Sequence, residues 1–218
     1  MPENKKLITK EFKSYLKASS PNYMLIILNS LIYIGLLYRY GIQDTFIANL
    51  DLFKFLLLSP MLITACLIDF RLQIIPNRLN LSIFEIGLVI AFIYGLSNVA
   101  ITINMLLGMI CGGGIFLGIT LIGGMIYGKE AMGLGDVKLM GALGLFFGVS
   151  NIIVISLLSF LIGAILSVFL LITKIKKTDE YIPFGPFIVI ATFISMFVPF
   201  DIILQILLSV FTLGLYKK

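Results

Sequence analysis

The sequence predicts an all-α protein, a polytopic bundle of six to eight transmembrane helices. Of its 218 residues, 60% are hydrophobic and 12% are charged, whereas an ordinary soluble domain has about 25% charged residues. The mean hydropathy is +1.10, and apolar runs of membrane-spanning length recur along the chain. Because no polar stretch is long enough to fold around its own core, we expect one membrane domain in residues 23–218.

The apolar runs set the predicted spans. Several are shorter than the roughly 20 residues that a helix perpendicular to the bilayer needs, so the count varies between six and eight. The predicted spans are residues 23–38, 52–68, 80–97, 100–126, 137–150, 151–173, 183–200 and 201–216. In the fourth span, glycines recur four residues apart, as in Gly108 with Gly112 and Gly114 with Gly118. This spacing predicts close helix packing.

Residues 1–22 form a separate basic segment. Five lysines lie within it, and apolar residues recur between them at helical spacing. We expect an amphipathic helix over residues 5–17 on the cytoplasmic membrane surface, with a disordered basic tail as the alternative. The basic region is too long for a cleaved signal peptide, and no small-residue cleavage site follows it.

The distribution of positive charge predicts the orientation. If the N-terminus is cytoplasmic and eight spans cross the bilayer, 14 of the 16 lysines and arginines lie on the cytoplasmic side, and Arg39 and Lys54 do not. Positive residues concentrate in cytoplasmic loops, so we expect an inner-membrane protein with a cytoplasmic N-terminus. The loops at residues 69–79 and 127–138 then lie on the same, cytoplasmic side.

The residue types exclude several kinds of site. The chain has no histidine, which excludes a Ser-His-Asp triad, a Cys-His pair and a His-Glu-x-x-His zinc site. The two cysteines, Cys66 and Cys111, lie in apolar runs and are expected to pack as small hydrophobic side chains. We therefore expect no metal site, no cofactor and no nucleic-acid partner. Hydrolytic chemistry would use carboxylates, Lys, Ser or Tyr.

Three of the eleven acidic residues stand apart from tails and loops. Asp69 ends an apolar run, Glu85 lies within the third predicted span, and Asp136 immediately precedes another apolar run. A charged group at the bilayer centre costs about 2.5–3.5 kcal/mol on insertion scales, and less near the interface. From position alone, Asp69 and Asp136 fit either boundary residues or a functional pair.

The local chain around the two aspartates favours a functional pair. Pro76 stops helical continuation after Asp69, and Gly133 and Gly135 permit a tight turn and a close backbone approach before Asp136. Asp136 then falls near the start of a helix, where the dipole favours a carboxylate. A plain N-cap is the alternative role for Asp136.

Three motifs resemble the signature of the type IV prepilin peptidases, the GxGD-type aspartic proteases. Asp69 is followed by Pro-Asn-x-Leu at residues 76–79, residues 133–139 read Gly-Leu-Gly-Asp-Val-Lys-Leu, and residues 182–187 read Ile-Pro-Phe-Gly-Pro-Phe. The three occur in the family's order. The resemblance implies that Asp69 and Asp136 are the catalytic aspartates, and that the substrates are type IV prepilins or pseudopilins cut on the cytoplasmic side of their hydrophobic stem.

Other residues of these motifs are candidates for shaping the site or binding substrate. They are Pro76, Asn77, Gly133, Gly135, Lys138, Glu85, Pro183 and Gly185. Lys138 fits a partner of Glu85, a neighbour that eases the charge of the acidic pair, or an interfacial lysine that extends to the membrane surface. Glu85 itself fits a helix-packing partner, a contact for a basic leader or a lipid-boundary residue.

The sequence departs from the family pattern in one respect, and two alternative functions stay open. Many family members also methylate the new N-terminus and have a cytoplasmic loop with Cys-x-x-Cys pairs, which this sequence lacks. This departure argues against N-methyltransferase activity. The alternative function is a small ion- or proton-coupled transporter that uses Asp69, Glu85 and Asp136 as a path. A presenilin-like intramembrane protease is a further alternative, although its aspartates would lie deeper in longer helices.

Overall fold

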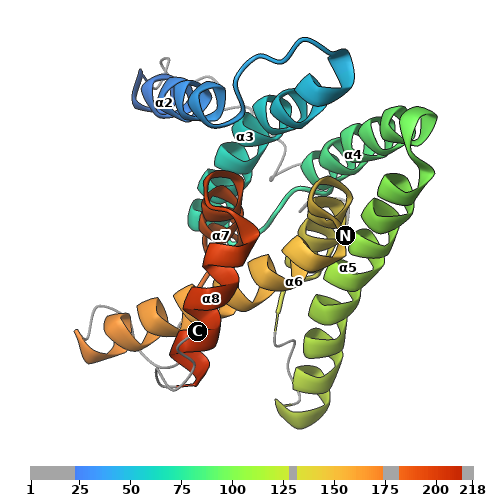
Figure 1. Ribbon diagram of the computed structural model, residues 1–218. Helices are drawn as coiled ribbons and strands as arrows, with labels where there is room; N and C mark the ends of the chain where they lie inside the picture. The colour runs from blue at the N-terminus through green and yellow to red at the C-terminus, as the bar shows by residue number, and fades with distance from the viewer. Residues whose placement is uncertain (1–22, 128–131, 174–181, 213–218) are drawn as a thin grey trace, which may run out of the picture.

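The computed structural model describes residues 23–127, 132–173 and 182–212, and these residues form seven helices and no strand. The basic segment predicted in residues 1–22 lies outside the described residues. Figure 1 shows the helices and their labels, which begin at α2. The helices are α2 (Tyr23–Tyr40), α3 (Phe46–Leu72), α4 (Asn77–Ser97), α5 (Val99–Tyr127), α6 (Leu134–Ile172), α7 (Gly185–Phe197) and α8 (Phe200–Phe211). The all-α prediction is confirmed.

Five of these helices are long and apolar enough to cross a membrane, judged by length and composition. These candidate spans are Tyr23–Tyr40, Asn49–Leu72, Asn77–Ser97, Val99–Ile126 and Leu134–Phe169. Helices α7 and α8 are apolar but shorter. Large apolar side chains such as Phe92 and Ile110 are exposed on the outer faces, as expected where lipid replaces water. The protein is therefore a multi-pass helical membrane protein.

Helix α6 combines two of the predicted spans. The sequence placed a break between residues 150 and 151, and the structure breaks the helical conformation close by, at Gly148, where two helical halves meet at a kink. Gly148 has φ 70° and ψ −179°, a conformation that only glycine adopts easily. The N–H of Val149 donates to Asn104 Oδ1 of α5 at 3.3 Å, which satisfies a donor at the start of the second half. Figure 1 shows the helix changing direction along its length.

Helix α5 packs closely against the first half of α6 through glycines. A Cβ atom on Gly108 would lie 2.5 Å from the carbonyl oxygen of Gly144, and one on Gly112 would lie 2.6 Å from the carbonyl oxygen of Met140. The packing predicted for this pair is confirmed. The prediction is wrong for Gly114 and Gly118, because neither has another group within 4 Å of a would-be Cβ.

The core lies where α3, α4, α6 and α7 meet. Its fully buried side chains include Leu58 and Leu62 of α3, Ile83 of α4, and Leu139 and Leu143 of α6. This packing fixes the C-terminal end of α3 beside the N-terminal ends of α6 and α7. Three chain segments that are far apart in the sequence are thereby brought to one place.

The opposite ends of α3 and α4 are joined by polar side chains. The hydroxyl of Tyr94 donates to Asp51 Oδ1 at 2.8 Å, and Lys54 forms an ion pair with the same carboxylate. Asp51 is therefore held in a helix by two side-chain partners. Most acidic residues were expected to lie in solvated tails or loops. This contact is at the other end of α3 from Asp69.

Candidate active site

Asp69 lies in the last turn of α3, and its side chain is 3% exposed. Helix α3 ends because Gln73 adopts φ 54°, the left-handed conformation that commonly closes a helix. The N–H of Gln73 donates to the carbonyl oxygen of Asp69 at 2.9 Å. Pro76, with φ −60° and ψ 132°, then starts α4. The turn between the helices keeps Asp69 at the end of its helix.

The Asp69 carboxylate is held from the other side by α7. Its Oδ2 accepts a hydrogen bond at 2.8 Å from the N–H of Gly185, the first residue of that helix. The first N–H groups of a helix have no partner within the helix, so this bond satisfies one of them. A Cβ atom on Gly185 would lie 2.6 Å from Asp69 Oδ2. Only glycine permits this approach of backbone to carboxylate.

Asp136 lies in the first turn of α6, as the third residue of the helix, and is 4% exposed. Its N–H donates to the carbonyl oxygen of Gly133 at 3.0 Å, which begins the helix. The plain N-cap role is therefore wrong, because Gly133 and not Asp136 precedes the helix. Asp136 Oδ1 is buried and has no hydrogen-bond partner among the described residues. An unpaired buried carboxylate oxygen is costly, which is characteristic of a functional group.

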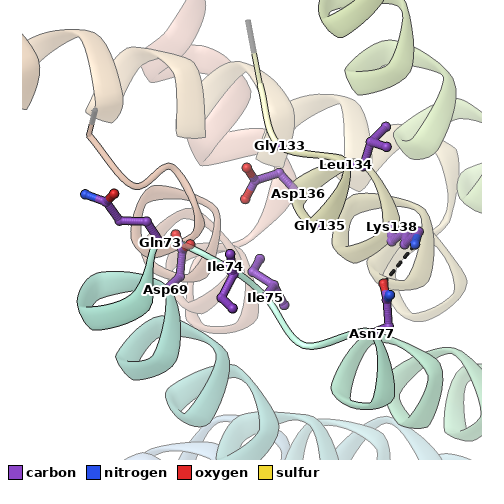
Figure 2. A pocket seen from close by; sticks show the side chains of 10 residues that line it. All are labelled: Asp69, Gln73, Ile74, Ile75, Asn77, Gly133, Leu134, Gly135, Asp136 and Lys138. Carbon is purple, nitrogen blue, oxygen red and sulfur yellow. Dashed lines mark hydrogen bonds between the residues drawn. The ribbon is translucent and has the colours of Figure 1, made fainter. Parts of the chain in front are cut away.

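The two aspartates share one cavity of about 300 Å³. Figure 2 shows Asp69 projecting into it from the end of α3 and Asp136 from the start of α6. The cavity is lined by Asp69, Gln73, Ile74, Ile75, Asn77, Gly133, Leu134, Gly135, Asp136 and Lys138. The fold therefore brings together two carboxylates that are 67 residues apart in the sequence. Both segments predicted to hold the chemistry contribute to its walls.

Helix N-termini adjoin both carboxylates. Asp136 is in the first turn of α6, and Asp69 accepts from the first N–H of α7. The positive ends of two helix dipoles thus lie near the acidic pair and favour negative charge on it. Two carboxyl groups in one site favour a state with one shared proton, so the pair can supply a base and an acid. Within the described ranges, no three metal-binding side chains gather closely enough to hold an ion.

Lys138 and Asn77 connect the two sides of the cavity. Lys138 Nζ of α6 donates to Asn77 Oδ1 of α4 at 2.8 Å, drawn as the dashed line in Figure 2. Lys138 thus bonds Asn77, and not Glu85. Glu85 is exposed on α4 and does not line the cavity. The structure therefore separates Glu85 from the aspartate pair.

The remaining candidates lie around the cavity or behind it. Gly133 and Gly135 line it, and a Cβ atom on Gly135 would approach Ile75 to 3.2 Å. Pro76 caps the start of α4 without lining the cavity, and Pro183 is buried just before α7. Gly185 reaches the site through its bond to Asp69.

One residue with a contact at the site was missed from the sequence. Asn80 of α4 is 3% exposed, and its Nδ2 donates to the carbonyl oxygen of Gly135 at 2.9 Å. This bond ties α4 to the turn before Asp136. A signal was present, because Asn80 lies three residues before Ile83 and seven before Gly87, on the buried face of the helix. A polar residue at such a position needs a partner.

Comparisons with known proteins agree with the motifs. The model of the type IV leader peptidase family matches residues 56–168. The chain is similar to proteins named prepilin leader peptidase/N-methyltransferase. The one from Aeromonas hydrophila is 30% identical over 65% of this chain and 48% of its own length. The one from Pseudomonas aeruginosa is 36% identical over 65% of this chain and 48% of its own length.

A third relative of that name, from Escherichia coli, is 31% identical over 62% of this chain and 58% of its own length. The chain spans about half the length of the curated relatives it matches. No solved structure matches it. The family match covers more than half of the chain and includes both aspartates. The chain therefore belongs to the type IV leader peptidase family.

Proposed function

We propose that this protein is a membrane aspartic endopeptidase that removes the leader peptide from type IV prepilins or pseudopilins. The observation that carries the proposal is the single cavity into which the buried Asp69 and Asp136 both project. Membership of the leader peptidase family supplies the substrate class. The relatives are named for cleavage of prepilin leaders, which supports the same activity here.

The mechanism uses the two carboxylates as base and acid. One of Asp69 and Asp136 is ionised and removes a proton from a water molecule, which attacks the scissile carbonyl carbon. The other is protonated and donates its proton to the carbonyl oxygen. The tetrahedral intermediate then collapses, the C–N bond breaks, and the amine leaves with a proton. This sequence of steps needs no acyl-enzyme.

The site is proposed to face the cytoplasm. The positive charge count supports a cytoplasmic location for the turn after Asp69 and the turn before Asp136. In the structure both aspartates lie at ends of candidate spans, where a substrate can enter from the interface. A prepilin whose apolar stem lies in the bilayer would present its scissile bond at this level.

The transporter alternative is not favoured. It needs Glu85 on a path with the two aspartates, and Glu85 is exposed outside the cavity. The family match also points to a peptidase.

The purified protein in detergent tests the proposed function. It is mixed with a prepilin that retains its leader and apolar stem, and the products are measured by mass spectrometry. We expect two products that meet at one peptide bond on the cytoplasmic side of the stem. An intact prepilin after long incubation with folded protein contradicts the proposal.

A further inference from the structure

An apolar groove of about 420 Å³ adjoins the site cavity. It is lined by Asn77, Asn80, Leu81 and Phe84 of α4, Met109 of α5, and Lys138, Gly141 and Ala142 of α6. Asn77 and Lys138 also line the cavity that holds the aspartates. The two spaces therefore adjoin each other at these two residues, which are joined by the hydrogen bond from Lys138 to Asn77.

The groove runs along the helices, away from the aspartates. Its α4 residues are spaced three or four apart, so they form one face of the helix over about two turns, or roughly 10 Å. The α6 residues have the same spacing and form the opposite wall. Gly141 and Ala142 have little or no side chain, which leaves room between the walls.

The chemistry of the lining changes along this length. Asn77 and Lys138 lie at the end that meets the site, Asn80 follows, and Leu81 and Phe84 lie deeper along α4. Because α4 is a candidate membrane span that begins at Asn77, the deeper part lies in the bilayer. The groove therefore passes from a polar entrance at the aspartates to an apolar end.

We propose that this groove binds the apolar residues of the substrate that directly follow the scissile bond. This inference rests on the proposed function. The occupant is a peptide segment with bulky apolar side chains, continuous with a scissile bond held between Asp69 and Asp136. The shared boundary with the aspartate cavity and the polar-to-apolar gradient of the lining both fit such a segment.

Two matched variants test the groove. Phe84→Ala removes an aromatic side chain from its wall, and Phe92→Ala removes the same side chain from the exposed outer face of α4. Each variant is assayed with the prepilin and with a derivative in which the first three residues after the scissile bond are serine. For Phe84→Ala we expect KM for the prepilin to rise about tenfold with kcat nearly unchanged. We expect KM for the serine derivative to change less than about twofold.

The control and the second variant make the outcome decisive. Phe92→Ala should leave both substrates unaffected. Leu81 is 54% exposed, so Leu81→Ala leaves the core intact and should also raise KM for the prepilin alone if Phe84→Ala fails to accumulate. The proposal is overturned if a groove variant affects both substrates equally, if Phe92→Ala has an equal effect, or if neither groove variant has an effect. Lipid would then be the occupant of the groove. If the unaltered protein cleaves neither substrate, the proposed function fails as well.

Discussion

Asp69 Oδ2 accepts a hydrogen bond at 2.8 Å from the backbone N–H of Gly185, although 116 residues separate them in the sequence. The bond joins the end of α3 to the start of α7 and fixes the carboxylate from outside its own helix. The fit leaves no room for a side chain, since a Cβ atom on Gly185 would lie 2.6 Å from the carboxylate oxygen. The position of Asp69 in the cavity therefore depends on a glycine in a different motif.

Gly185→Ala is expected to displace the Asp69 carboxylate and reduce cleavage of prepilin. A displacement of about 1 Å in a reacting group costs on the order of 100-fold in rate, so we expect a loss of that order in kcat. The measurement is the rate of prepilin cleavage by purified protein. Gly114→Ala on α5 is the matched control, because a Cβ there meets no other group within 4 Å. Equal rates for Gly185→Ala and the unaltered protein would show that the contact does not position Asp69.

Asn80→Leu is expected to loosen the turn that carries Asp136. The variant keeps the branched shape and the number of heavy atoms of the side chain, but it removes the amide that donates to the Gly135 carbonyl at 2.9 Å. Loss of one such bond costs about 0.5–1.5 kcal/mol, so we expect kcat to fall up to about tenfold. Separate values of kcat and KM for the serine-substituted prepilin check this, since that substrate does not rely on the groove. Asn151→Ala serves as control, because the hydrogen bond of the Asn151 amide described by the structure stays within α6, to the Phe147 carbonyl oxygen across the bend, and does not reach the site. A normal kcat in Asn80→Leu contradicts the positioning role.

Much of the site could be predicted from the sequence, because its motifs place chemistry-bearing residues beside helix breakers. The turn after Asp69 and the glycines before Asp136 have a local cause that is readable in the chain. The contacts of Gly185 with Asp69 and of Asn80 with Gly135 were not predictable. They depend on which helix faces meet, and spacing along one helix does not report its neighbours.

The fold was predictable to a similar extent. Apolar run length predicted helices, and α4 and α5 match the expected spans within a few residues. The glycines show the limit of predicting helix packing from residue spacing. Gly108 packs against Gly144, whereas Gly114 faces open space, although both belong to pairs with the same spacing. Spacing identifies a face that permits close packing, and only the tertiary structure shows whether a second helix occupies it.

Gly108→Ala is expected to destabilise the contact between α5 and α6. The added Cβ would lie 2.5 Å from the Gly144 carbonyl oxygen. The Cβ is bonded directly to the backbone and the oxygen is a backbone atom, so neither can move away without shifting a helix. Overpacking of this kind costs about 1–3 kcal/mol in the free energy of unfolding. Thermal unfolding in detergent micelles measures the change, with Gly114→Ala as the substitution that should not destabilise. An unchanged unfolding midpoint for Gly108→Ala would contradict the close packing of the two helices.

The mature product is expected to have an unmethylated N-terminus. The relatives are named for both peptidase and N-methyltransferase activity. The resemblance described above links the second activity to Cys-x-x-Cys pairs, and the sequence contains none. Mass spectrometry of the cleaved pilin, made with S-adenosylmethionine present, distinguishes the two outcomes. A product one methyl group heavier than the mature chain would overturn this expectation without affecting the peptidase assignment.

The central claim is that Asp69 and Asp136 together perform the hydrolysis. The most direct measurement is prepilin cleavage by Asp69→Asn and Asp136→Asn, because each variant keeps the side-chain volume and removes the ability to exchange a proton. We expect each to abolish cleavage while its amount in the membrane stays close to that of the unaltered protein. Processing of prepilin at a normal rate by either variant would contradict the account.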